Sequence, residues 1–226
     1  MKTTFYGHAC FAVQIKNRTL LFDPFITPNE LAKSIDVNQV PADYILITHG
    51  HSDHLADAVT IAKRTGAPII APFEVARWCE KQGAPKIHPV NHGGAAKLDV
   101  CSARLVNAIH SSSLPDGSYG GNPGGFVVES SEGNFYYAGD TALTMDMKLI
   151  PEFTKLKFAV LPVGDNFTMG PAEAARAADF VKAGQVLGVH FDTFPPIKID
   201  HAAAIEIFAK QGKKLYLLKP GESHDF

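Results

Sequence analysis

The sequence predicts an α/β protein of four layers, an αββα sandwich in which two β-sheets pack face to face and helices cover their outer faces. Short alternating apolar segments, typical of strands, come first, and helices then alternate with strands along the rest of the chain. The composition, with 46% hydrophobic and 19% charged residues, is that of a globular protein. A length of 226 residues suits one sizeable core, so a single domain over residues 1–226 is expected.

The first half of the chain begins with strands and continues with helices. Strands are expected over 2–6, 10–15 and 19–22, and the segment 28–41 is irregular with a short helix near 30–34. The apolar run 44–48 indicates a buried strand. Helices are expected over 55–64 and 73–82, where Gly66 and Gly83 end them. Further strands are expected over 68–71, 87–90, 96–100 and 103–109.

The second half alternates between the two kinds of element. Residues 111–125 are dense in Ser, Gly and Pro and indicate a loop that, together with 27–39, shapes a pocket. Residues 126–129 and 134–138 pair as a hairpin. Helices over 143–153, 171–182 and 200–211 then alternate with strands over 158–162, 185–189 and 214–218.

The segment that follows the 44–48 strand, His49-Gly50-His51-Ser52-Asp53-His54, is rich in metal-ligand types. His49 and His51 point to the same side if the extended geometry persists, and Gly50 permits an unusual backbone angle between them. Either Ser52 or Asp53 is expected to cap the next helix. The pairs His49/His51 and Asp53/His54 can face two neighbouring metal ions. The alternative is a polar turn whose histidines only form hydrogen bonds, but side chains this close are hard to satisfy without a cation.

Three other residues of ligand type, His110, Asp140 and His190, each follow the end of an apolar strand. In layered α/β folds, the loops at strand ends are where ligands gather. Each residue alone is as readily explained by hydrogen bonding or helix capping. Together with the first segment they make five His and two Asp, enough for two cations that share one bridging carboxylate.

The order of these motifs resembles that of the metallo-β-lactamase superfamily over essentially the whole chain. Within it, three stretches look like a group of small bacterial and archaeal metal-dependent hydrolases similar to the ascorbate-phosphate lactonase branch: Gly7-His8-Ala9, Phe22-Asp23-Pro24 and His190-Phe191-Asp192-Thr193-Phe194-Pro195. The resemblance implies the metallo-β-lactamase fold. It also implies that His49, His51 and His110 hold one metal and that Asp53, His54 and His190 hold the other, with Asp140 bridging.

The resemblance further implies roles for residues beside the metals. His8 is expected near the metals with Asp53 as a catalytic residue, or else as a structural histidine. Asp23 is expected to hold a ligating histidine by its outer nitrogen, and Asp192 and Thr193 to orient a ligand or donate to a leaving group. Two divalent ions are expected, Zn²⁺ foremost, while imidazole and carboxylate ligands also accept Mn²⁺, Fe²⁺ or Ni²⁺.

The expected function is a metal-dependent hydrolase, in which a hydroxide held by two metals attacks an ester, lactone, amide or phosphoester bond of a small substrate. One alternative is a phosphodiesterase that acts on nucleic acid or phospholipid headgroups. Another is a non-hydrolytic metal-binding protein with a redox or sensor role.

Charge and cysteine usage bear on partners and location. The net charge is −2 and no run of Lys or Arg occurs, which speaks against nucleic acid as a partner. No apolar stretch is long enough to span a membrane, and the N-terminus has no signal-peptide pattern. Cys10, Cys79 and Cys101 are expected to be reduced thiols of a cytoplasmic protein. A homo-oligomer is compatible with the sequence.

Overall fold

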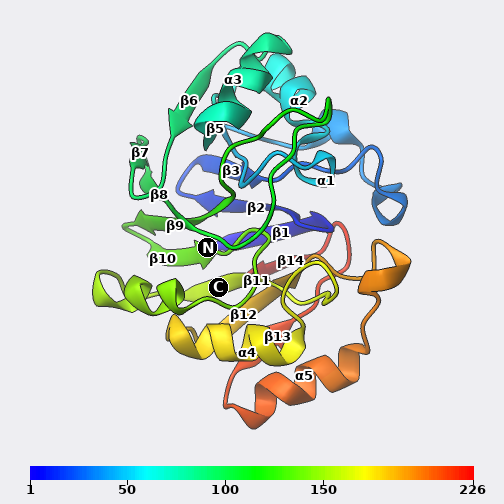
Figure 1. Ribbon diagram of the computed structural model, residues 1–226, viewed down its shortest axis with the longest axis vertical. Helices are drawn as coiled ribbons and strands as arrows, with labels where there is room; N and C mark the ends of the chain where they lie inside the picture. Colours follow the sequence, from blue (N-terminus) through cyan, green and yellow to red (C-terminus); the bar gives the residue numbers. More distant parts are fainter.

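The computed structural model describes all 226 residues. Its strands form two seven-stranded sheets that pack face to face (Figure 1). In the first sheet the strand order is β14 (Ser223–Asp225), β1 (Lys2–Gly7), β2 (Cys10–Ile15), β3 (Arg18–Phe22), β4 (Tyr44–Leu46), β5 (Ile69–Pro72) and β6 (Ile87–Val90). In the second it is β13 (Lys214–Tyr216), β12 (Gln185–Val189), β11 (Phe158–Pro162), β10 (Gly133–Tyr137), β9 (Gly124–Ser130), β8 (Cys101–Asn107) and β7 (Ala95–Lys97).

Helices form the two outer layers. Figure 1 shows α2 (Ala58–Thr65) and α3 (Phe73–Lys81) above the first sheet, and α4 (Pro171–Phe180) and α5 (His201–Lys210) below the second. Short helical turns complete the list: α1 (Ser52–Leu55) and the 3₁₀ segments η1 (Glu30–Ala32), η2 (Val37–Gln39), η3 (Met145–Glu152) and η4 (Pro195–Ile197). The predicted αββα arrangement is confirmed. No helix combines the length and the apolar character needed to cross a lipid bilayer.

Each sheet is antiparallel on one side and parallel on the other. The strands from β3 to β6 pair in parallel, as do those from β10 to β13. Parallel neighbours require crossover connections, and α2, α3, α4 and α5 supply four of the six, while 3₁₀ segments lie in the other two, from β3 to β4 and from β10 to β11. The carboxyl ends of β4 and β12, which belong to different sheets, lie at the same side of the molecule, because His54 and His190, which follow them, have ligand atoms within 4.8 Å of each other.

Aromatic side chains from both sheets fill the space between them. The rings of Phe11 and Phe22 stack with centroids 4.6 Å apart, and Phe22 meets Phe135 of the second sheet at 5.8 Å. Tyr137 contacts both Phe11 and Phe22 edge-on. These fully buried rings fix the distance between the sheets and bring the loops at the ends of the strands together.

The predicted helix over 55–64 is wrong in its bounds, because the structure divides this region into α1 and α2. The break lies at Asp57, whose backbone N–H donates to Pro24 and whose carboxylate accepts from the backbone N–H groups of Ile26 and Thr27. The predicted capping is also wrong. His51 occupies the N-cap position without a side-chain cap, and both Ser52 and Asp53 lie inside α1.

Other bounds differ for local reasons. The segment expected as a helix over 143–153 is a 3₁₀ helix over Met145–Glu152, with Pro151 near its end. The strand expected over 103–109 ends at Asn107, three residues before His110, and β9 begins inside the expected 111–125 loop. The edge strand β14 is polar, so only its pairing with β1 defines it.

Candidate metal centre

Three imidazoles converge at one end of the gap between the sheets. One ring nitrogen each of His49, His51 and His110 lies within 4.8 Å of the others. His49 Nε2 and His51 Nδ1 are only 3.0 Å apart, so the two side chains point to one place as their spacing predicts. Gly50 has no unusual backbone angle. A Cβ there would be in tight contact, at 3.1 to 3.3 Å, with Ser112, Ser113 and Leu114, and the Gly50 N–H donates to Ser112 Oγ.

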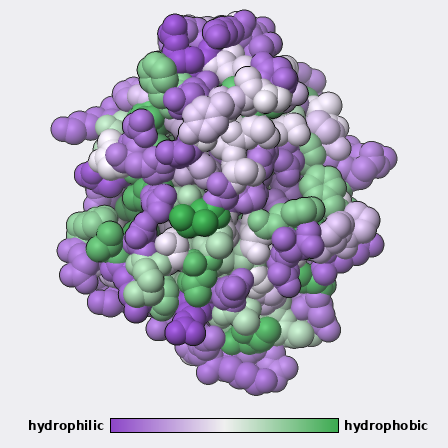
Figure 2. Space-filling model, in the orientation of Figure 1, coloured by the Kyte–Doolittle hydropathy of each residue, from purple (hydrophilic) through white to green (hydrophobic).

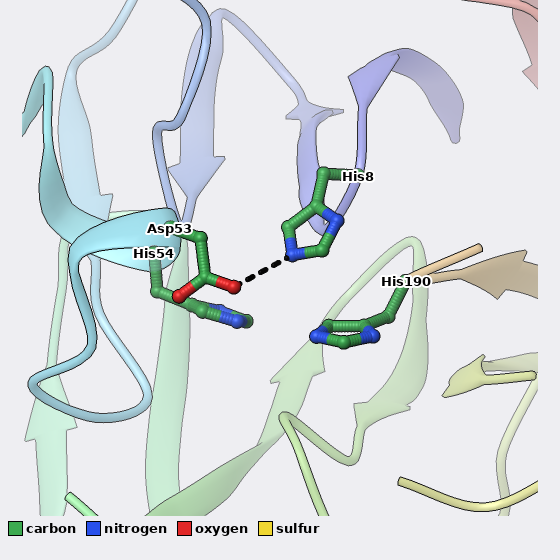
Figure 3. A group of neighbouring side chains, drawn as sticks. All are labelled: His8, Asp53, His54 and His190. Atoms are coloured by element: carbon green, nitrogen blue, oxygen red, sulfur yellow. Dashed lines mark hydrogen bonds and ion pairs between the residues drawn. The ribbon is translucent and has the colours of Figure 1, made fainter. Parts of the chain in front are cut away.

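A second group lies beside the first. Ligand atoms of Asp53, His54 and His190, together with His8, also lie within 4.8 Å of one another. Figure 3 shows that Asp53 and His54 come from the short helix α1, whereas His8 follows β1 and His190 follows β12. The structure thus brings together residues that are up to 182 positions apart, namely His8 and His190.

The carboxylate of Asp140 lies between the two groups. Its Oδ2 is 2.9 Å from His190 Nε2 and 3.2 Å from His54 Nε2 in the second group. The same oxygen is 3.6 Å from His110 Nε2 and 4.0 Å from His49 Nε2 in the first. Asp140 is only 3% exposed, so these approaches to both groups are largely shielded from water.

Asp23 fixes which ring nitrogens face this centre. This fully buried carboxylate accepts hydrogen bonds from the Thr48 hydroxyl at 2.7 Å and from His54 Nδ1 at 2.9 Å. Because the Thr48 hydroxyl donates to Asp23, it accepts from His49 Nδ1, which is 2.9 Å away. The Nε2 atoms of His49 and His54 are therefore the atoms left to hold a cation.

Two more hydrogen bonds complete the surroundings of Asp23. Its carboxylate also accepts from the Tyr137 hydroxyl at 2.6 Å and from the backbone N–H of Thr48 at 2.8 Å. Tyr137 belongs to the second sheet, whereas Asp23 and Thr48 follow strands of the first. The sheets are thus connected at the point where they support the histidines.

His8 holds the carboxylate of Asp53. His8 Nε2 is 3.1 Å from Asp53 Oδ2, and His8 Nδ1 is 2.9 Å from the Thr193 hydroxyl. A neutral His8 that donates from Nε2 accepts from Thr193 at Nδ1. Thr193 therefore lies on the side of the His8 ring away from Asp53, and His8 fixes the direction of the Asp53 side chain.

The pKa directions follow from burial and from these contacts. Burial would raise the pKa of Asp140, but His190 and His54 hold it well below its usual range. Burial would lower the pKa of His54, but Asp140 and Asp23 hold it well above its usual range. Burial and the neighbouring His190 lower the pKa of His8 to about 4, so this ring is neutral. The cluster therefore carries ionised carboxylates beside imidazoles.

Several backbone positions around the centre are unusual. His8, Asp23 and His190 adopt positive φ angles of 54°, 41° and 57°. The N–H of His190 donates to the carbonyl of His8 at 2.7 Å, so the two strained turns support each other. Gly139 has φ of 63°, and a Cβ there would lie 2.6 Å from the carbonyl oxygen of Gly124. Only glycine fits directly before Asp140.

A cavity of about 260 Å³ opens onto the centre. Its lining residues are His51, Asp53, His110, Ser111, Asp140, Phe167, His190 and Phe194. Of the two segments expected to shape it, 111–125 contributes Ser111 and 27–39 contributes no lining residue. A larger cavity of about 830 Å³ lies between η3 and the outer face of the second sheet, but none of the seven candidate ligands lines it.

Comparison with known proteins identifies the family. The family model described as a β-lactamase superfamily domain matches residues 18–191. The chain belongs to the metallo-β-lactamase superfamily. A UPF0173 metal-dependent hydrolase of Christiangramia forsetii is 54% identical over 224 residues, which cover 99% of each chain. The chain is therefore a metal-dependent hydrolase.

Solved structures agree with this assignment. The metallo hydrolase Igni18 of the archaeon Ignicoccus hospitalis superimposes with a TM-score of 0.88 at 32% identity, over 100% of this chain and 98% of the other. The isothiocyanate hydrolase from gut bacteria of Delia radicum has a TM-score of 0.79 at 20% identity, over 100% and 99%. This second likeness shows the shared fold alone.

The residues of the hydrolase fit a divalent metal. Buried His54 Nε2 and Asp140 Oδ1 have no hydrogen-bond partner in the protein, and such orphan atoms are costly unless something binds them. Imidazoles and carboxylates are the ligand types that zinc and similar ions take. The three cysteines lie elsewhere as buried free thiols.

The residues expected beside the metals have different positions. Asp23, His8 and Thr193 contact candidate ligands or each other, as described above. Asp192 does not: its carboxylate is 2.7 Å from His201 Nε2 and accepts from the backbone N–H of Ile199.

Four residues near the centre were given no role by the sequence analysis: Thr48, Tyr137, Phe167 and Phe194, the last of which lies in the stretch from His190 to Pro195 quoted there. Thr48 directly precedes His49, so its position beside the histidine motif could have indicated a role in supporting a ligand. Tyr137 lies 114 positions from Asp23, and no local pattern connects the two.

Proposed function

We propose that this hydrolase uses two divalent cations to cleave an ester, lactone, amide or phosphoester bond of a small substrate. His49, His51 and His110 would hold one cation, Asp53, His54 and His190 the other, with Asp140 between them. Zn²⁺ suits this ligand set best, and Mn²⁺, Fe²⁺ and Ni²⁺ are also compatible with it. The observation that supports the proposal is the position of Asp140 Oδ2 within 4.0 Å of imidazoles from both groups.

The chemistry that two bound divalent cations would supply is a lower pKa of water, so that hydroxide is available near neutral pH, and polarisation of the attacked carbonyl or phosphoryl group. The protein's own residues orient and enclose this centre. Asp23 and Thr48 orient His54 and His49, and His8 holds Asp53 with support from Thr193. We assign His8 a positioning role through Asp53.

A substrate panel tests the proposal. The full-length protein is loaded with zinc and assayed with p-nitrophenyl acetate, a lactone, a thioester and bis-p-nitrophenyl phosphate. We expect turnover of at least one of them, which a chelator abolishes and added metal restores. His49→Ala should lose both metal and turnover, whereas His88→Ala, at an exposed histidine outside the centre, should keep both. Full turnover by His49→Ala or by the chelated protein would contradict the proposal.

We also propose a cytoplasmic location. The three cysteines are buried, unpaired thiols, and burial raises the pKa of Cys79 and Cys101 to about 12. Unpaired thiols are usual in reducing compartments. Fractionation of cells that express the protein with a C-terminal tag tests this: recovery outside the cytoplasm would contradict it.

A further inference from the structure

Two aromatic rings line the cavity that opens onto the candidate metal centre. Phe167 and Phe194 are the only apolar residues among its eight lining residues. Neither contributes a ligand atom, and Phe167 is 53% exposed although a ring of this size is more stable away from water. An exposed phenylalanine held beside a reaction site is suited to bind an apolar part of a ligand.

We propose that the substrate carries an uncharged, apolar group next to the bond that is cleaved, and that Phe167 and Phe194 bind this group. The inference rests on the proposed function and names the substrate class of the same site.

The loop that carries Phe167 holds it in place. Asp165 and Asn166 have φ angles of 61° and 55°, so two consecutive left-handed residues form a tight turn directly before it. Asp165 N–H donates to the carbonyl of Met169, and Met169 N–H donates to the carbonyl of Thr141, both at 3.1 Å. Thr141 follows Asp140, so the turn is attached to the backbone of the central carboxylate. The backbone of the turn that carries Phe167 is therefore in place before a ligand arrives.

Phe194 is held by contacts with other rings beside His8. Its ring lies 5.4 Å from that of His8 in an edge-on arrangement and 6.4 Å from that of Phe25. The next two residues are Pro195 and Pro196, which restrict the backbone. Phe194 is half-buried, so one part of the ring packs on the protein and another part lines the cavity.

The charges around the cavity favour the same class of substrate. Its lining includes the carboxylates of Asp53 and Asp140 but no Lys or Arg. Any bound cations would interact with the part of the substrate that reacts. A separate anionic group on the substrate would therefore lose its hydration in the cavity without gaining a cationic partner. A volume of about 260 Å³ suits a small apolar group beside the reacting bond.

A pair of hydroxamic acids tests the inference without requiring turnover. The hydroxamate head can bind the metals, and the two probes have tails of similar shape. One is 4-methylpentanohydroxamic acid, with an apolar tail, and the other is succinic acid monohydroxamate, with a carboxylate in the same place. Dissociation constants are measured by calorimetry on the zinc-loaded full-length protein. We expect the apolar probe to bind at least about tenfold more tightly, since its tail buries apolar surface whereas the charged tail loses hydration.

Substitutions assign the preference to the two rings. Phe167→Ala and Phe194→Ala should each reduce the ratio of the two dissociation constants several-fold, up to roughly tenfold. Phe194→Leu, which keeps an apolar side chain, should lie between Phe194→Ala and the unsubstituted protein. The matched control is Phe153→Ala: Phe153 is 58% exposed but does not line this cavity, and its loss should leave the ratio unchanged. Metal content is measured for every variant.

The outcomes separate this inference from the proposed function. Equal or tighter binding of the charged probe, or an unchanged ratio in both alanine variants, overturns the inference even if the panel substrates are cleaved. If the apolar probe is preferred but no bond in the panel is cleaved, the proposed function fails, while the assignment of Phe167 and Phe194 as an apolar binding site stands.

Discussion

The carboxylate of Asp23 accepts a hydrogen bond from Nδ1 of His54 at 2.9 Å, across 31 positions of sequence. Both side chains are fully buried, and the same carboxylate oxygen also accepts from Thr48 and Tyr137. This contact turns His54 Nε2 toward Asp140. The orientation of the candidate ligands is thus built into the protein by residues that do not face the cavity.

Asp23→Asn should weaken zinc binding by roughly 10- to 100-fold, because the amide cannot accept all the hydrogen bonds that orient His54 and Thr48. Competition with a chromophoric chelator measures the change. The matched control is Asp57→Asn, since Asp57 is also a buried aspartate that accepts two backbone hydrogen bonds but contacts no candidate ligand. Equal zinc affinity in the two variants would contradict the role given to Asp23.

Two neighbouring tyrosines, Tyr137 and Tyr136, should differ in how loss of the hydroxyl changes the free energy of unfolding. Tyr137→Phe removes a donor to a buried carboxylate and should lower the free energy of unfolding by about 1.5–3 kcal/mol. The Tyr136 hydroxyl is buried without a partner, so Tyr136→Phe should be neutral or stabilising. Urea unfolding of chelator-treated protein measures both. A larger loss for Tyr136→Phe would refute this description of the two hydroxyls.

His8→Ala should reduce kcat/KM at least about tenfold and weaken binding of the second zinc, because Asp53 loses the group that holds its carboxylate. Thr193→Val should have a smaller effect in the same direction, since Thr193 acts through His8. Asp192→Asn should leave kcat/KM unchanged, because Asp192 contacts His201 and Ile199 instead. Steady-state kinetics and zinc titration of the three variants check this order, and a loss with Asp192→Asn that matched His8→Ala would contradict it.

Gly139→Ala should destabilise the protein by about 3 kcal/mol or more and displace Asp140, because its Cβ would clash with the Gly124 carbonyl at a positive φ. Gly66→Ala is the control: it has φ of 75° but nothing within 4 Å of the new Cβ, so about 1 kcal/mol is expected. Urea unfolding and zinc stoichiometry distinguish the two sites. Similar losses in both variants would mean that only the backbone angle matters.

The sequence was sufficient for the features that depend on local pattern. The spacing of His49 and His51 predicted that both point to one place, and Asp140 and His190, which lie 2.9 Å apart, were singled out as candidates because each follows an apolar strand. The αββα layers followed from the order of strands and helices. These features depend on residues that are close together in the sequence, so they can be recognised from the sequence alone.

What the sequence could not supply depends on contacts between distant segments. The break at Asp57 arises because its carboxylate binds the backbone of residues 26 and 27. The contact of Tyr137 with Asp23 requires the exact approach of two sheets. Phe167 has no motif at all, and it is placed by a turn whose backbone bonds reach Thr141. Such contacts are set by tertiary packing, which overrides local preference.

The number of metal ions bound per chain tests the central claim most directly. Elemental analysis of the full-length protein, after zinc loading and removal of free metal, should give two zinc ions per chain. Asp140→Ala should fall to one or fewer, because this carboxylate contacts both groups of imidazoles. No bound zinc in the unsubstituted protein, or two tightly bound ions in Asp140→Ala, would contradict the account.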